Sequence, residues 1–152
     1  MKTCKRLYAK EGLVKNKEID ETLKNKALAG FARVPFVQLL GMEFVDISYG
    51  EAIVRLEMRD ELRQPQGVLH GGATASVIDT AMAFAVITCL ETGEKATTID
   101  LTVHYLRPVA EGEIVCTAKV VRAGRRILTV SAECVNAEGK LTATALSTYT
   151  KI

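Results

Sequence analysis

One segment of the chain, residues 73–90, predicts a helix that is apolar on nearly every side. Asp79 is its only charged side chain. A helix without a polar face must be covered over most of its surface, by lipid or by protein. A membrane span needs about 20 mostly apolar residues, and an aspartate near its centre costs roughly 2.5 kcal/mol or more on insertion scales. Hydroxyl residues also interrupt this segment, so we expect a helix wrapped by a sheet.

Period-two patterns on both sides of the helix predict the sheet that covers it. Strands are expected at residues 42–48, 52–58, 99–105, 113–122, 126–135 and 140–151. The first two form a hairpin around Tyr49-Gly50. Short turns at Gly124 and at residues 136–139 make the last three strands consecutive and antiparallel. One long helix packed by an antiparallel sheet is an α+β fold.

Two of these strands have distinct faces. On the second strand, the apolar face consists of Ala52, Val54, Leu56 and Met58. On the strand after the helix, the apolar face consists of Ile99, Leu101, Val103 and Tyr105, and the opposite face of Thr98, Asp100, Thr102 and His104. His104 is therefore expected on a polar face, away from catalysis. The chain has 2 histidines, which lie far apart without supporting ligands and do not indicate zinc.

Length and composition indicate a compact enzyme or binding domain. The 152 residues, 48% of them hydrophobic and 25% charged, suffice for one well-buried core. A net charge of +2 gives no general case for nucleic acid. Cys4, Cys89, Cys116 and Cys134 lack metal-ligand spacing and are expected to be reduced packing residues. No signal peptide is expected at the start, so we expect a cytoplasmic protein without a membrane partner.

Residues 1–34 differ in character from residues 35–152 and are expected to form a basic helical extension. Apolar residues recur every fourth position at Ile19, Leu23, Ala27 and Phe31. This spacing predicts an amphipathic helix that ends near Gly30 and Pro35. We interpret it as a solvated helix that covers an edge of the domain, in preference to a nucleic-acid-binding arm or a transit peptide.

The candidate site lies where a glycine pair precedes the apolar helix, in the order Gln64, His70-Gly71-Gly72, Asp79. The glycines predict a turn and allow the close approach of a ligand. The first N–H groups of a helix lack intrahelical partners and suit a developing oxyanion. The alternative is that the glycines only shape the turn and that His70 is a helix-capping or core histidine.

His70 and Asp79 are nine residues apart, which is roughly 13 Å along a helix at ~1.5 Å per residue. The two side chains therefore cannot share a hydrogen bond within one chain. If both act on one small group, the site is composite, with His70 from one subunit and Asp79 from another. The spacing thus points to a symmetric dimer.

These residues, with Thr80 after Asp79, resemble the motif of the hotdog-fold acyl-CoA thioesterases of the phenylacetate-degradation and 4-hydroxybenzoyl-CoA thioesterase type. The resemblance covers roughly residues 35–152 and includes Tyr-Leu-Arg-Pro at residues 105–108. It implies a hotdog fold and hydrolysis of an acyl-CoA to a carboxylic acid and free coenzyme A. It also implies a homodimer assembled into a dimer of dimers, with no metal or redox cofactor. Aryl and fatty acyl groups both remain open.

The resemblance also implies roles for the site residues. The Gly71 N–H polarises the thioester carbonyl, while His70 and Gln64 orient it. Asp79 of the partner subunit activates water as a general base, or attacks the carbonyl directly to give an anhydride. Thr98 falls where related thioesterases have a hydroxyl near the attacking water; the alternative is an ordinary threonine on a strand.

Four arginines are candidate ligands of the coenzyme A phosphates, beside Gly72 as a substrate-binding position: Arg107, Arg122, Arg125 and Arg126. Guanidinium groups bind phosphate in a bidentate geometry. Arg107, in the Tyr-Leu-Arg-Pro match, and Arg125, beside Gly124, are the better candidates. The alternative for each is a solvated turn residue.

Two other functions share this fold. A ligand-sensing hotdog domain would bind acyl-CoA without cleaving it, but the ionisable Asp79 favours catalysis. A hotdog dehydratase carries a proline-rich histidine motif that the chain lacks. Release of free thiol from a panel of acyl-CoAs would separate the three functions.

Overall fold

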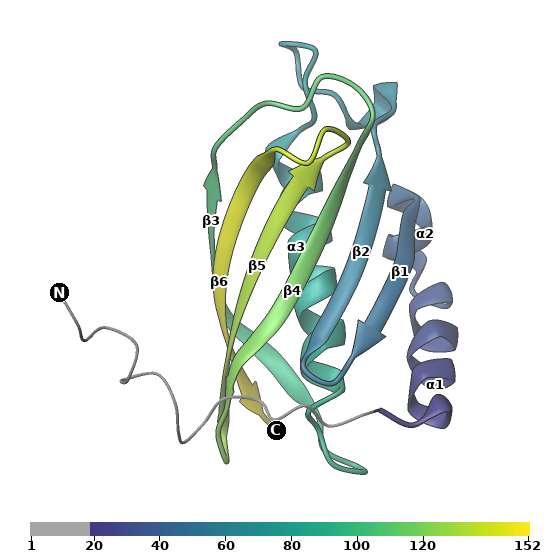
Figure 1. Ribbon diagram of the computed structural model, residues 1–152, viewed down its shortest axis with the longest axis vertical. Coiled ribbons are helices and arrows are strands. Elements are labelled where there is room, and N and C mark those ends of the chain that lie inside the picture. The colour runs from purple at the N-terminus through teal and green to yellow at the C-terminus, as the bar shows by residue number, and fades with distance from the viewer. Residues whose placement is uncertain (1–18) are drawn as a thin grey trace, which may run out of the picture.

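A computed structural model describes residues 19–152 (Figure 1). Its elements are α1 (Glu21–Ala32), α2 (Pro35–Leu40), β1 (Met42–Ser48), β2 (Glu51–Glu57), η1 (Asp60–Leu62), α3 (Gly71–Ile87), β3 (Ala96–Tyr105), β4 (Glu113–Ala123), β5 (Ile127–Asn136) and β6 (Leu141–Lys151). The strands of this part of the chain form one antiparallel sheet in the order β1-β2-β4-β5-β6-β3. The sheet curves around α3, which confirms the predicted α+β hotdog fold.

The apolar helix α3 is the centre of the core. Val77, Ile78, Ala81, Met82 and Ala85 are each 0% exposed. Full burial of a large apolar side chain contributes roughly 1.5–3 kcal/mol, so this helix supplies much of the stability of the fold. None of the helices between residues 19 and 152 is long and apolar enough to cross a membrane.

The strand predictions are confirmed within a residue or two at most ends. The predicted inner face of β2 is buried, with Ala52 and Val54 at 0% and Leu56 at 1% exposed; Met58 lies beyond the end of the strand and is half-buried. β4, β5 and β6 are consecutive antiparallel neighbours, as expected. Cys116 and Cys134 are free, buried and opposite each other on β4 and β5, which agrees with a packing role.

The predicted faces of β3 are wrong at Thr98 and Ile99. A β-bulge between Thr98 and Asp100 interrupts the pairing of β3 with β6. A bulge adds one residue to a strand and reverses the side-chain alternation beyond it. Thr98 therefore shares the α3-facing side with Leu101 and Val103, which pack against the core. The expectation that Thr98 lies on the polar face, beside Asp100, is corrected by this bulge.

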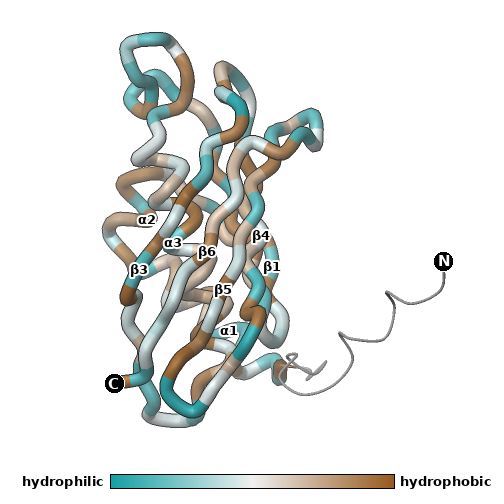
Figure 2. The backbone as a smooth tube through the Cα atoms, turned by 90° about the vertical axis from the view of Figure 1, so that its left-hand side faces the viewer, coloured by the Kyte–Doolittle hydropathy of each residue, from teal (hydrophilic) through white to brown (hydrophobic). Residues whose placement is uncertain are grey.

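β3 is an edge strand with an exposed surface. It pairs only with β6 among the described strands, and Figure 2 shows it along one side of the sheet. Ile99 and Tyr105 are each 55% exposed, so the predicted apolar face is only partly covered within one chain. The other edge, β1, contacts α1 and α2. The sheet thus has one covered edge and one open edge.

α1 is the expected amphipathic helix. It ends at Ala32, two residues beyond the expected Gly30. Phe31 is 4% exposed, and its ring centroid lies 5.0 Å from that of Phe44 and 5.2 Å from that of Phe84 in edge-to-face geometry. α1 is therefore anchored in the core of the domain. Most of the predicted basic extension lies outside the described residues, and the predicted boundary at residue 34 stays a prediction.

Candidate active site

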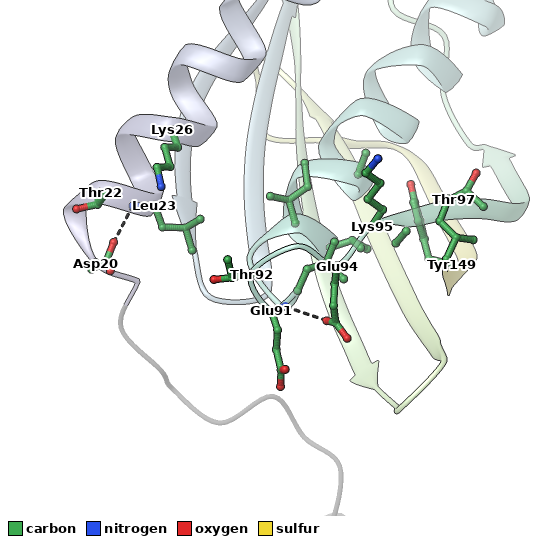
Figure 3. A pocket seen from close by; sticks show the side chains of 16 residues that line it. Asp20, Thr22, Leu23, Lys26, Glu91, Thr92, Glu94, Lys95, Thr97 and Tyr149 are labelled. Carbon is green, nitrogen blue, oxygen red and sulfur yellow. Dashed lines mark hydrogen bonds between the residues drawn. The ribbon is translucent and has the colours of Figure 1, made fainter.

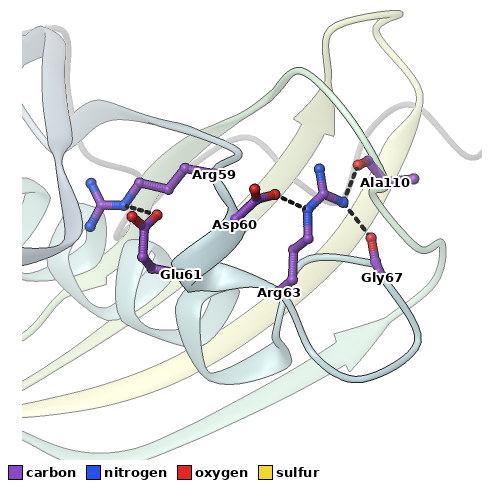
Figure 4. A network of polar contacts seen from close by, with 6 residues as sticks. All are labelled: Arg59, Asp60, Glu61, Arg63, Gly67 and Ala110. Atoms are coloured by element: carbon purple, nitrogen blue, oxygen red, sulfur yellow. Dashed lines mark hydrogen bonds and ion pairs between the residues drawn. The ribbon is translucent and has the colours of Figure 1, made fainter.

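The loop before α3 is fixed by backbone and arginine contacts. The His70 N–H donates to Leu62 O at 2.8 Å, and the Leu69 N–H to Val109 O at 2.7 Å. Arg63 donates from Nε to Asp60 Oδ1 at 2.8 Å and from Nη1 to the carbonyl oxygens of Gly67 and Ala110 (Figure 4). These contacts hold the loop against the segment that precedes β4.

Gln64 lies at the start of a closed turn in this loop. Its N–H donates to Val68 O, and the Gly67 N–H donates to Gln64 O, both at 2.9 Å. Gly67 has a φ of 78°, which residues with a side chain adopt only with strain. Gln64 is half-buried and lines a cavity, so the turn fixes its backbone at the wall of the site.

His70 is the N-cap of α3. Its Nδ1 accepts a hydrogen bond from the Gly72 N–H at 2.9 Å. The capping interpretation of His70 is therefore confirmed. A neutral imidazole whose Nδ1 accepts carries its proton on Nε2, so the cap leaves an N–H donor at the exposed end of the ring. One side chain can thus both start the helix and orient a ligand.

Gly71 is the first residue of α3 and has a free donor. Within residues 19–152, its N–H donates to no protein acceptor. It stands at the positive end of the helix dipole. On its other side, the Tyr105 hydroxyl donates to Gly71 O at 3.0 Å, and a Cβ at Gly71 would lie 3.3 Å from the Tyr105 ring. Side chains larger than hydrogen therefore crowd this position.

A cavity of about 390 Å³ opens beside this donor. Gln64, Gly71 and Arg107 line it, so the structure brings three predicted site residues together. Its volume lies within the usual range of ligand sites, roughly 300–1,000 Å³. His70 and Gly72 instead line a hollow of about 310 Å³, so they do not share the first cavity within one chain.

Asp79 is exposed on α3, beside the open-edge strand β3 and its neighbour β6. The Thr98 hydroxyl donates to Asp79 Oδ1 at 3.4 Å. The Tyr149 hydroxyl donates to Asp79 O, also at 3.4 Å. Burial raises the pKa of Tyr149 to about 12, so this phenol stays a neutral donor at physiological pH. The carboxylate therefore has a neighbouring hydroxyl and a fixed backbone.

Gly71 and Asp79 do not meet within one chain. Both lie on the continuous helix α3, and eight residues correspond to about 12 Å along the axis at 1.5 Å per residue. Gly71 lies beside Tyr105 at one end of β3, and Asp79 beside Thr98 near the other end. The two halves of the candidate site are therefore at opposite ends of the open edge strand.

The four arginines separate into two places. Arg107 lines the Gln64 cavity, and its Nη1 donates to Leu141 O at 2.6 Å. Arg122, Arg125 and Arg126 are exposed around the β4–β5 turn, where Arg126 O accepts from the Lys151 N–H. Thr142, beside Arg107, and Lys151 are nine steps apart on β6, which is about 30 Å at ~3.3 Å per residue.

Comparison with known proteins identifies the family. Residues 66–143 match the family model described as the thioesterase superfamily. The human acyl-coenzyme A thioesterase 13 is 33% identical over 111 residues, which are 71% of this chain and 79% of that protein. The chain belongs to the thioesterase superfamily. It is a thioester hydrolase, as the predicted motif indicated.

The fold of this thioesterase is also similar to that of solved structures. A conserved protein of Pseudomonas aeruginosa, PA5202, is 35% identical with a TM-score of 0.76, over 81% of this chain and 98% of that chain. The E. coli PaaI protein from the phenylacetic acid degradation operon is 26% identical with a TM-score of 0.78, over 86% and 96%. Both are similar to nearly the whole described structure.

Sequence reasoning missed three residues that hold the site. Arg63 fixes the loop, Tyr105 contacts Gly71, and Tyr149 contacts Asp79. Tyr105 stood in the apolar alternation and in the Tyr-Leu-Arg-Pro match but was given no role, and Tyr149 was visible only as part of the last strand. The signal that could have found Arg63 is its place next to Gln64 in a loop that must be rigid.

Proposed function

We propose that this thioesterase hydrolyses acyl-CoA thioesters at composite sites, each formed by Gly71 of one subunit and Asp79 of its partner. The observation that supports this is the position of the two groups at opposite ends of the open edge strand β3. An unpaired edge presents N–H and C=O groups that pair readily with another strand. The exposed Ile99 and Tyr105 favour a second copy of the chain as that partner.

Antiparallel pairing of two β3 strands about their midpoint would complete the site. The Thr98 end of one strand would then lie near the Tyr105 end of the other. Asp79 of one subunit would approach the partner subunit's Gly71, and the twofold axis would create two equivalent sites. The further step to a dimer of dimers stays a prediction, which light scattering of the purified protein would test.

The chemistry follows from the groups at each half. The Gly71 N–H and the helix dipole would stabilise the developing oxyanion, while His70 and Gln64 orient the carbonyl. Asp79 would take a proton from water as the water oxygen attacks the carbonyl carbon, and the C–S bond then breaks to release the coenzyme A thiol. Direct attack by Asp79 through a mixed anhydride is the alternative. A thioester is already activated, so neither route needs a metal or redox cofactor.

The same pairing would gather the arginines. The β4–β5 turn lies at the Ala96 end of β3, because Arg126 and Ala96 both adjoin Lys151. In the dimer, this turn would lie toward the partner subunit's Arg107. Guanidinium groups from both subunits would then be available for the phosphates of one coenzyme A.

A thiol-release assay tests the proposal. Purified protein is incubated with a panel of acyl-CoAs and a thiol-reactive dye, beside Asp79→Asn. We expect turnover by the wild type and a large loss in the variant. Binding of acyl-CoA without thiol release would instead support the ligand-sensing function and overturn the catalytic one.

A further inference from the structure

A larger cavity, of about 780 Å³, lies between α1 and the second half of α3 (Figure 3). Ala83, Val86 and Ile87 of α3 form one wall, and Leu23 of α1 and Tyr149 of β6 lie on opposite sides of it. No predicted site residue lines this cavity. Its volume is in the upper part of the usual range of ligand sites, roughly 300–1,000 Å³.

The cavity begins one helical turn from the carboxylate of the proposed site. Asp79, Ala83 and Ile87 are spaced by four residues on α3, so they share one face of the helix. Tyr149 lines the cavity and donates to Asp79 O. A single ligand could therefore occupy the cavity and also place a carbonyl group beside Asp79.

The walls nearest Asp79 are uncharged: Ala83 of α3 is apolar, and Thr97 of β3 and Tyr149 of β6 add only hydroxyl groups. The charged lining residues come from α1, its N-cap and the loop after α3, and α3 itself contributes none. Two of these charged groups are already engaged: Glu94 pairs with Lys151 at 2.7 Å, and Asp20 accepts from the Leu23 N–H at 2.7 Å. The inner part of the cavity thus suits an uncharged apolar group, with water and charge at its outer end.

We propose that this cavity binds the acyl group of the substrate and selects extended aliphatic chains over compact aryl groups. The inference rests on the proposed function. The distance along α3 from Asp79 to Ile87 is about 12 Å, which corresponds to an extended chain of about ten carbons, because bonds of ~1.5 Å at angles near ~111° advance roughly 1.25 Å each. A benzoyl or phenylacetyl group would leave much of the cavity unfilled and lose its dispersion contacts.

The outer wall is contributed by α1, so the N-terminal helix sets the acyl preference. Leu23 lines the cavity, whereas Leu28, on the same helix, is exposed and does not. Leu23→Trp should therefore fill the cavity, and Leu28→Trp is its matched control. The two substitutions make the same chemical change on one helix.

The experiment measures kcat/KM of the full chain for acyl-CoAs from butanoyl to tetradecanoyl, and for benzoyl-CoA and phenylacetyl-CoA. In the wild type we expect a rise of roughly three- to fourfold per added methylene up to about ten carbons. Leu23→Trp should lower the dodecanoyl-to-butanoyl ratio about tenfold or more, and Leu28→Trp should leave it unchanged. A flat profile, an aryl preference, or equal effects of the two variants would overturn the proposal while the thioesterase function stands.

Calorimetric binding of dodecanoate separates the two proposals. If no acyl-CoA is hydrolysed but dodecanoate binds, and Leu23→Trp alone weakens that binding, the cavity assignment stands and the proposed function fails. If dodecanoate does not bind to the wild type and long acyl-CoAs are not preferred, the cavity assignment is overturned whatever the activity.

Discussion

The hydroxyl of Tyr105 donates a hydrogen bond to the carbonyl oxygen of Gly71, at 3.0 Å. The bond connects the end of the open strand β3 to the first turn of α3. It fixes the peptide group that contains Gly71 O. The adjacent peptide group carries the Gly71 N–H, which is the proposed oxyanion donor. Tyr105 also lines the cavity beside Gly71 but takes no part in the proposed chemistry, so we expect it to influence the rate through the Gly71 peptide.

We expect Tyr105→Phe to lower kcat several-fold with little change in KM. One hydrogen bond contributes about 0.5–1.5 kcal/mol, and its loss would loosen the donor only in the step where negative charge develops. Steady-state kinetics and a thermal melt measure the two effects. Unchanged kcat in both Tyr105→Phe and Tyr105→Leu would show that this bond does not position Gly71.

Asp79→Asn is expected to retain the fold and to reduce kcat by ~10²–10⁴-fold, the usual range for a lost acid–base group. Asp79 is exposed within its own chain, so the change should leave folding intact, as circular dichroism would show. Glu133 is an exposed carboxylate on β5. Glu133→Gln is therefore the control and should keep wild-type turnover. Near wild-type turnover of Asp79→Asn would exclude its catalytic role.

Mixing two inactive variants tests the composite site. His70→Ala removes the cap and the Nε2 donor, and Asp79→Asn removes the base, so each homodimer should be nearly inactive. In an equal mixture after subunit exchange, half of the dimers carry one intact site, and activity should recover to about a quarter of the wild-type value. If mass spectrometry shows heterodimers and no turnover returns, the two groups do not serve one site.

Arg107→Ala should raise KM for acyl-CoA with little change in kcat, because contacts to phosphates act similarly in the ground and transition states. Arg125→Ala should do the same if the β4–β5 turn approaches the partner's site. Both effects should shrink at high salt, since exposed charges are screened within ~8–10 Å at ordinary ionic strength. Equal KM values at low salt would reject both arginines as phosphate ligands.

Tyr149 predicts a pH dependence of stability. Its pKa is raised from 10.0 to about 12, mainly by burial, so the folded state holds this proton more tightly than the unfolded state. The resulting stabilisation is present below pH 10 and is lost as the pH rises to about 12, by roughly 2–3 kcal/mol at most. Urea unfolding across this range should show a smaller alkaline loss for Tyr149→Phe. An identical loss in both proteins would contradict this origin.

Local periodicity was enough to predict α3 and the strands, because their apolar faces are set by contacts that recur along the chain. It was not enough for Thr98, whose face is reversed by a bulge that depends on the pairing of β3 with β6. The role of His70 as a cap followed from local chemistry and was among the stated alternatives. The cavity beside Ala83 could not be foreseen, because its walls come from α1, α3 and β6, and no local pattern records how such distant segments pack.

The aromatic contacts of Phe31 bear on how this enzyme can be dissected. An expression clone that starts at residue 35 would lack Phe31, and the rings of Phe44 and Phe84 would keep only their contact with each other, at 5.7 Å between centroids. Loss of a buried phenylalanine side chain costs about 3–5 kcal/mol, a large share of the stability of most small domains, about 5–15 kcal/mol. The shortest autonomous unit should therefore retain α1. A clone trimmed to residues 35–152 is expected to lose solubility, so that its catalysis could not be measured.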